Sequence, residues 1–209
     1  MNKNEKRYDN LSEAVAFEIA FEFMLYSYDN IGFYDIYREE CTTCRKPIQY
    51  NDFLAPKSNC KKDYAILDTY NFGISEKIRN ELIENFDISE KDFRPIRNKS
   101  GDIVFYQITP QHKMLPISDV NRIKQLKPCK KCGSVQYRIK EYKNNKGEEY
   151  YYISKKALED LHDINVTYEK FDMFIPEFII SRRVYDYLIE KYPRMRFIPL
   201  FLKEDRGRF

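Results

Sequence analysis

Two segments of the chain share one pattern of hydrophobic and polar positions. In each, an apolar run ends at a serine, Ser75 or Ser181, and apolar residues at helical spacing follow. Such a serine is typical of a helix N-cap, because its hydroxyl accepts a hydrogen bond from an amide of the first turn. Each serine also precedes a Leu-Ile-Glu by the same distance. We therefore predict strand-helix-strand units at about 64–97 and 171–202, related either by duplication or by coincidence between two well-capped helices.

The apolar positions indicate which face of each helix is buried. They are Ile78, Leu82 and Phe86 in the first unit and Val184, Leu188 and Tyr192 in the second. The second strands are expected at Phe93–Ile96 and Phe197–Leu200, where a proline in each favours the edge or end of a strand. A weaker match to the same pattern, Tyr152–Leu161, predicts a third capped helix.

The remaining segments give a coarser picture. Ser12–Tyr26 fits a helix, although its Phe21, Phe23 and Leu25 also alternate as in a strand. Ile103–Ile108 and Ser134–Tyr142 predict strands, and a turn at 144–147 is expected to fold the latter back onto 149–153 as a hairpin. Because no Gly/Ser/Pro-rich linker separates these elements, we expect a single α+β domain over residues 1–209.

Composition narrows the class of protein. The chain has 209 residues, of which 33% are charged and 43% hydrophobic, and a mean hydropathy of −0.69. These values exclude a disordered tail or a fibrous protein. The most apolar early stretch, Val15–Tyr26, contains Glu18 and Glu22 and is shorter than the ~20 apolar residues of a membrane span. With no apolar signal segment after the first ten residues, we expect a cytoplasmic protein without a membrane helix.

Four of the five cysteines form two C-x-x-C pairs, Cys41/Cys44 and Cys129/Cys132. Two such pairs supply the four soft ligands of a tetrahedral Zn²⁺ site, each pair wrapped in a knuckle, here at 41–44 and 129–133. Gly133 suits the second knuckle because it tolerates the positive φ of a tight turn. The expected fold is therefore one of strand-helix-strand units repeated about two zinc-knuckle hairpins of rubredoxin-like or ribbon type. The zinc would stabilise the fold, because 85 positions separate the two pairs.

Two other interpretations of the cysteines stay open. The pairs could act in redox chemistry, which requires a cysteine at a helix N-terminus, or they could be two unrelated buried pairs. Cys60 stands alone and fits a free thiol. His112 and His162 would serve as ligands only if one pair failed.

Motifs of the common enzyme classes are absent from the sequence. It contains no P-loop, dinucleotide-binding glycine motif, H-E-x-x-H or G-x-S-x-G. The two histidines lie at unrelated positions, and no cysteine stands beside a plausible base, so a catalytic triad cannot be assembled from the sequence. We therefore expect a protein that is not an enzyme.

A basic band and a surplus of tyrosine point to binding. Between residues 122 and 146, nine basic residues stand against Glu141 alone, while the whole chain carries +3. Lysines could contact phosphates there and tyrosines could stack on bases, although a solvated lysine-rich hairpin is the simpler interpretation. The 18 tyrosines, with no tryptophan, suit a core or a protein-binding surface.

Several motifs of the second half occur together in one family. They are Pro128–Gly133, Leu161–Ile164, Phe171–Phe174, Phe178–Ser181 and Arg196–Phe197. In this respect the chain resembles the double C-x-x-C-G motif proteins, which are bacterial immunity proteins of contact-dependent toxin systems. The family's order of a first knuckle, a central strand-helix segment and this C-terminal part is matched by Cys41–Cys44, Asp68–Ile96 and Cys129–Leu200. The strand-helix-strand at the end also looks like a broader group of polymorphic-toxin immunity proteins, and Arg45 replaces the family's first glycine.

The resemblance implies that the protein binds a cognate toxin domain and blocks it by stoichiometric occlusion. A few tyrosine and arginine anchors would then carry the affinity. Because the pI is 8.4, the toxin-binding face is not expected to be a uniformly acidic patch. The candidate partner-binding residues are Tyr137, Arg138, Lys140, Tyr142, Tyr150 and Tyr152. The alternative is a zinc-knuckle nucleic-acid-binding protein that uses the basic band at 122–146.

Overall fold

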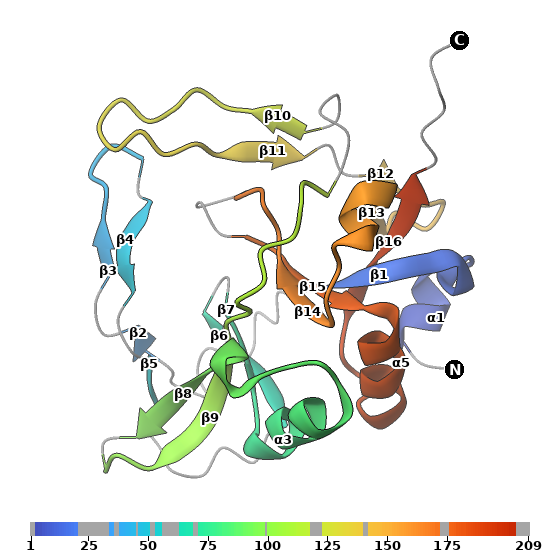
Figure 1. Ribbon diagram of the computed structural model, residues 1–209, viewed down its shortest axis with the longest axis horizontal. Helices are drawn as coiled ribbons and strands as arrows, with labels where there is room; N and C mark the ends of the chain where they lie inside the picture. Colours follow the sequence, from blue (N-terminus) through green and yellow to red (C-terminus); the bar gives the residue numbers. More distant parts are fainter. Residues whose placement is uncertain are drawn as a thin grey trace. The chain divides into compact units, whose positions relative to one another are not determined.

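The computed structural model describes residues 3–20, 34–35, 38–44, 46–50, 53–55, 63–68, 71–98, 100–117, 123–139, 142–171 and 176–203. The chain divides into two compact units. The first comprises Met1–Ala20, His112–Pro128 and Ser134–Phe209, and the second comprises Phe21–Gln111 and Cys129–Gly133. The fold is mixed α+β, with more sheet than helix (Figure 1).

The first unit contains a six-stranded sheet in the order β12-β13-β16-β1-β15-β14 and the two-stranded β10-β11. Its strands are β1 (Ala14–Ile19), β10 (Ile123–Gln125), β11 (Tyr137–Ile139), β12 (Tyr142–Lys143), β13 (Glu149–Ser154), β14 (Ile164–Val166), β15 (Phe178–Ser181) and β16 (Phe197–Lys203). Its α-helices are α1 (Lys3–Arg7), α4 (Lys155–Glu159) and α5 (Arg182–Lys191), and a 3-10 turn, Leu11–Glu13, precedes β1.

The sheet of the first unit is buried on both faces around β1. On one face, Tyr185 of α5 stacks on Phe17 with ring centroids 3.6 Å apart and meets Phe197 edge-on. On the other face, Ala16 joins an apolar cluster with Ile153, Ile179 and other residues of this unit. Because β1 is central, five of its six residues are buried, which accounts for the weak strand periodicity of this segment.

The second unit contains a six-stranded sheet in the order β2-β5-β8-β9-β7-β6 and the hairpin β3-β4. The strands are β2 (Tyr34–Asp35), β3 (Arg38–Glu40), β4 (Pro47–Tyr50), β5 (Phe53–Ala55), β6 (Tyr64–Asp68), β7 (Asn71–Ile74), β8 (Phe93–Asn98) and β9 (Ile103–Ile108). The α-helix is α3 (Glu76–Asn85), and a 3-10 turn, Glu90–Asp92, leads into β8.

The two six-stranded sheets have the same arrangement of strand directions. In each, a strand, a serine-capped helix and a second parallel strand cross over a central antiparallel strand: β7-α3-β8 over β9, and β15-α5-β16 over β1. The outer pairs also correspond, since β5 runs parallel to β8 as β13 does to β16. The chain order differs, because β9 follows β8 directly whereas β1 precedes every other strand of its sheet.

The register of the two sheets agrees residue by residue. Gly73 pairs with Gln107 and Ile74 with Tyr106, as Ile179 pairs with Glu18 and Ile180 with Phe17. The next residue along the chain, Ser75 or Ser181, is the capping serine. Its amide donates to the carbonyl of the aspartate that precedes the outer strand, Asp63 for Ser75 and Asp163 for Ser181.

Several sequence predictions are confirmed. Ser75, Ser154 and Ser181 each cap a helix with the side-chain oxygen, which accepts from the amide three residues on. Ile103–Ile108 forms β9, and Tyr142 pairs with Tyr150 across the expected hairpin turn.

Two predictions need correction. Ala14–Ile19 is a strand, so the helical interpretation of this segment is wrong, while 21–26 lie outside the described residues. The strand expected at 134–142 is divided, because Tyr137–Ile139 pairs with β10 and only β12 joins the hairpin.

None of the helices in the described ranges has the length and apolar content that crossing a membrane requires. The single domain over 1–209 stays a prediction.

Candidate metal centre

Two short turns of the second unit carry the cysteine pairs. Cys41–Cys44 forms the turn between β3 and β4, which is closed by the Cys41 amide donating to the Lys46 carbonyl at 2.9 Å. In the second turn, the Gly133 amide donates to the Cys129 carbonyl at 2.8 Å, and Gly133 takes a φ of +69°. A side chain at Gly133 would be strained in this left-handed conformation, so the glycine allows the turn to close.

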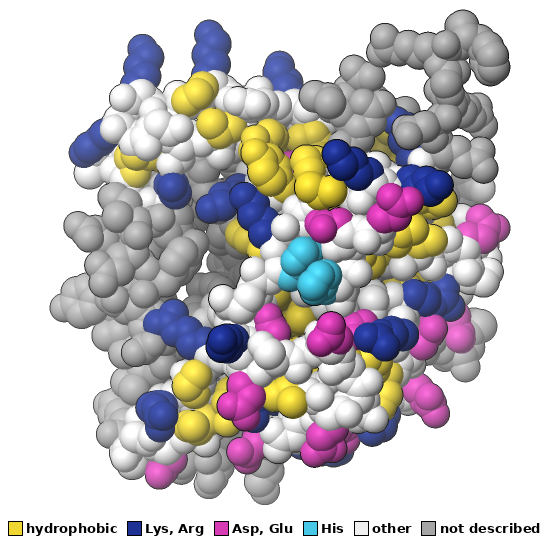
Figure 2. Space-filling view, in the orientation of Figure 1, with side chains coloured by type: hydrophobic (Ala, Val, Ile, Leu, Met, Phe, Trp, Pro, Cys, Tyr) yellow, Lys and Arg dark blue, Asp and Glu magenta, His cyan; other side chains and the backbone are white. Residues whose placement is uncertain are grey.

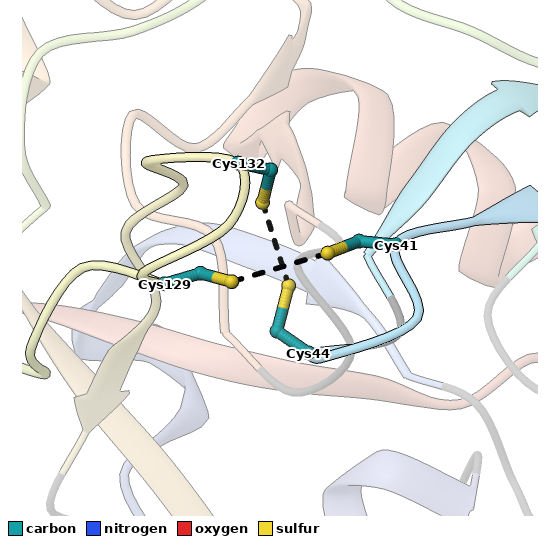
Figure 3. A group of neighbouring side chains, drawn as sticks. All are labelled: Cys41, Cys44, Cys129 and Cys132. Carbon is teal, nitrogen blue, oxygen red and sulfur yellow. Dashed lines mark hydrogen bonds between the residues drawn. The ribbon is translucent and has the colours of Figure 1, made fainter.

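All four sulfur atoms converge on one point. The four Sγ atoms lie within 4.8 Å of one another. Cys41 Sγ is 3.9 Å from Cys129 Sγ, and Cys44 Sγ is 3.6 Å from Cys132 Sγ. Figure 3 shows the side chains of each turn directed toward those of the other. These separations are much longer than the ~2.0 Å of a disulfide bond, so the sulfurs are arranged as a group and not as bonded pairs.

The separations match those of ligands around a tetrahedral ion. With metal–sulfur bonds of ~2.3 Å, the edges of a thiolate tetrahedron are about 3.8 Å long. The distances of 3.6 and 3.9 Å given above lie on either side of that value. The group is therefore compatible with a metal site, and four thiolates leave no open position for a substrate.

Backbone amides surround the sulfur of Cys41. Hydrogen bonds from the amides of Cys44 and Thr43 lower the pKa of the Cys41 thiol. Burial raises the pKa of Cys44 to about 12, and a hydrogen bond from the Lys46 backbone opposes that rise. Cys41 is itself 2% exposed. The first turn thus provides the inward-pointing amides that a metal-thiolate knuckle requires.

A side-chain contact also joins the two turns. Lys131 Nζ donates to Thr42 Oγ1 at 2.8 Å. This contact was not predicted, because a lysine and a threonine 89 positions apart carry no pattern that links them. The hydrogen bond links the two cysteine turns independently of their sulfur atoms.

The geometry decides between the earlier interpretations of the cysteines. Two unrelated pairs are excluded, because both pairs contribute to one group of sulfurs. A strand follows each turn, β4 and β11, and not the helix of a thioredoxin-like redox site. His112 and His162 stack on each other with centroids 3.7 Å apart in the first unit and belong to no metal group among the described residues. Cys60 lies outside the described residues.

Three of the candidate partner-binding tyrosines form one cluster in the first unit. Tyr142, Tyr150 and Tyr152 have ring centroids 4.9 to 5.6 Å apart. Phe201 of β16 extends the cluster, with its centroid 5.6 Å from that of Tyr150. The three tyrosines are half-buried on the β12 edge of the sheet. The strand predicted from the sequence ended at Leu200, and the parallel pairing of Phe201 with Tyr152 was not predicted.

The other candidate residues lie elsewhere. Tyr137 belongs to β11, where its ring meets Tyr168 edge-on at 6.4 Å, and burial raises the pKa of its hydroxyl. Arg138 is exposed on the same strand, and Lys140 lies outside the described residues. Among the candidate residues that the structure describes, the tyrosines of β12 and β13 contact one another, whereas Tyr137 and Arg138 belong to β11.

Comparison with known proteins gives no relative. No protein-family model, curated protein or solved structure matches the chain.

Proposed function

We propose that Cys41, Cys44, Cys129 and Cys132 bind one Zn²⁺ ion as a structural centre. The convergence of four sulfurs from two turns that are distant in sequence carries this proposal. Four-sulfur tetrahedral sites favour zinc or iron, and zinc is the usual structural ion. When bound, the ion joins the β3-β4 hairpin to the 129–133 turn and so stabilises the second unit.

Metal stoichiometry tests this proposal. Purified protein should contain one zinc per chain by elemental analysis, and Cys41→Ser and Cys129→Ser should each lose it together with thermal stability. Cys60→Ser is the matched control and should keep the zinc. An absence of bound metal, or loss of zinc from only one of the two variants, would contradict a shared site, and iron in its place would contradict the identity of the ion.

We further propose that the protein acts by binding and not by catalysis, as a cytoplasmic immunity protein that occludes a bacterial toxin domain. The motifs shared with the double C-x-x-C-G proteins support this role, because they follow the family's order over most of the chain. The cluster of Tyr142, Tyr150 and Tyr152 supplies candidate anchors, since tyrosine buries a large area with few rotatable bonds.

The test is direct binding to a toxin domain encoded beside this chain. A 1:1 complex by calorimetry and rescue of growth in cells that express the toxin are expected. Tyr142→Ala and Tyr152→Ala should each weaken the complex about 30-fold, which corresponds to a hot-spot loss of ~2 kcal/mol. Tyr168→Ala is the control, because Tyr168 is 44% exposed and makes no contact with the cluster. If the toxin binds and both cluster variants retain full affinity, the cluster is not the binding surface. If a folded, zinc-loaded protein does not bind or protect against that toxin, the immunity role is wrong.

A further inference from the structure

The β10-β11 ribbon of the first unit has one apolar face and one basic face. Ile123 pairs with Ile139, and both side chains pack in the apolar cluster of that unit. Lys124 pairs directly with Arg138, and alternation along the strands turns these two to the opposite face. Both are exposed, as is Lys127 just beyond β10. The ribbon therefore presents cations on the side away from its apolar cluster.

Every charged side chain between residues 123 and 139 is positive. They are Lys124, Lys127, Lys130, Lys131 and Arg138. Like charges directly opposite each other in a sheet are destabilising, so the Lys124–Arg138 pair does not contribute to folding. In Figure 2, Lys and Arg side chains project along the margin where Figure 1 places β10 and β11.

The cations of the ribbon differ in their ion pairs from the lysines of the next hairpin. Lys143 lies 3.9 Å from Glu149, and Lys146 pairs with Asp9. No ion pair among the described residues involves Lys124, Lys127 or Arg138. Among the described residues of the basic band, the lysines of the β12-β13 hairpin are therefore paired with carboxylates, and the cations of the β10-β11 ribbon are not.

We propose that the basic face of β10-β11 binds the phosphate backbone of nucleic acid without base preference. Lysine is depleted from protein–protein interfaces, whereas lysine and arginine are the residues that contact phosphates. Two of the three cations, Lys124 and Lys127, are lysines, so the composition of the face favours a phosphate chain over an acidic protein. This inference goes beyond the proposed zinc centre and toxin binding, and none of its residues is a metal ligand or a member of the tyrosine cluster.

Fluorescence anisotropy with labelled oligonucleotides tests the proposal. Mixed-sequence single strands and duplexes of about 20 nucleotides should bind the zinc-loaded full chain, and the affinity should fall steeply between about 50 and 200 mM salt. In the double variant Lys124→Gln/Arg138→Gln, the slope of log K against log salt should become less steep by about 2, which is about 1 for each phosphate that the protein no longer neutralises. Far-UV circular dichroism checks that the variant is folded.

A second double variant separates a local site from the effect of net charge. Lys156→Gln/Arg194→Gln removes the same charge from exposed positions of the same unit, and it should bind as the unmodified chain does. Equal weakening in both double variants, or no binding at the lowest salt, would overturn the proposal. Polyglutamate that competes as well as an unlabelled oligonucleotide would also overturn it and would point to an acidic protein partner.

Discussion

The two six-stranded sheets share strand order and register but differ in how a helix covers them. In the first unit, α5 buries Val184, Tyr185, Leu188 and Ile189. At the corresponding place in the second unit, α3 buries only Ile78 and Leu82. The sheet with the thinner apolar layer is also the one whose unit carries the four cysteines. A metal bound there would add a cross-link to the unit whose helix buries fewer apolar residues.

One helix position shows the difference most clearly. Four residues after the capping serine, α5 has Tyr185, which packs on Phe17 and Phe197. Four residues after Ser75, α3 has Arg79, whose guanidinium lies 4.7 Å from the ring centroid of Tyr106. Both side chains contact the central strand of their sheet. Tyr185 is 2% exposed, whereas the Arg79 side chain is 14% exposed, so the tyrosine is the more fully buried of the two.

The largest expected difference follows metal removal. Chelation should expose the amides of β8 and β9 to hydrogen exchange while β1 and β16 stay protected, because both cysteine turns that the proposed ion would join belong to the second unit. Structural zinc contributes on the order of 10 kcal/mol to small zinc domains. Exchange followed by mass spectrometry measures this. Equal loss of protection in both sheets would mean that the units unfold together and that the comparison fails.

The next largest difference, in the free energy of unfolding, is expected between substitutions of Tyr185 and Arg79, which lie four residues after the two capping serines. Tyr185→Ala is expected to destabilise by about 3–5 kcal/mol, as for other large aromatic truncations in a core, whereas Arg79→Ala should cost about 1 kcal/mol. Urea unfolding measures both. Tyr185→Phe is the control: its hydroxyl is buried without a hydrogen-bond partner among the described residues, so removing that hydroxyl should not destabilise. Equal costs for the two alanine variants would contradict the difference in burial.

A smaller difference in the free energy of unfolding is expected between substitutions of the two capping serines, Ser181 and Ser75. Ser181 accepts from the Val184 amide and also donates to Asp163 Oδ1 at 2.7 Å, while Asp163 is 4% exposed. Ser181→Ala should therefore cost about 2 kcal/mol, because it removes a cap and a hydrogen bond to a buried carboxylate. Ser75→Ala removes only the cap and should cost about 1 kcal/mol. The ranking is tested by the midpoints of chemical unfolding, and the reverse order would refute it.

The smallest expected effect concerns Glu18 and its counterpart Gln107, which occupy the same register position and are each 6% exposed. Burial raises the pKa of Glu18 well above its usual range, and the Glu177 carboxylate adds to the rise. The folded state then keeps a proton that the unfolded state releases above about pH 4.3, so stability falls as the pH rises from there toward the folded pKa.

Glu18→Gln should remove this loss. The variant should unfold about 2–4 °C higher at pH 8, the shift that ~1 kcal/mol gives in a chain of this size. At pH 4 the difference should disappear. Scanning calorimetry at the two pH values measures it, and a variant that is less stable at pH 8 would show that the carboxylate is satisfied by its surroundings.

Local patterns in the sequence predicted local structure well. The three serine caps and the strand at Ile103–Ile108 follow from hydrogen bonding and apolar spacing over a few residues. β1 was ambiguous because a strand buried on both faces loses its alternation. β10 was missed, since its three residues acquire a partner only from β11.

The candidate site was predictable for a different reason. Cysteines rarely occur in spaced pairs without a shared role in chemistry, so four ligands could be named before their distances were known. The tyrosine cluster could be predicted only in part, because adjacency of Phe201 to Tyr150 depends on a parallel pairing between distant strands. Strand pairing of this kind leaves no local signal.

The place of β1 between β15 and β16 has a consequence during synthesis on the ribosome. Phe178, the first residue of β15, follows Ile19 by 159 positions. At about 5–20 residues per second, β1 waits roughly 8–32 s for either neighbour. Throughout that interval an apolar strand with two open edges precedes the entire second unit as it emerges. A chaperone or a nascent partner has its best access to this protein then, before β15 and β16 have been made.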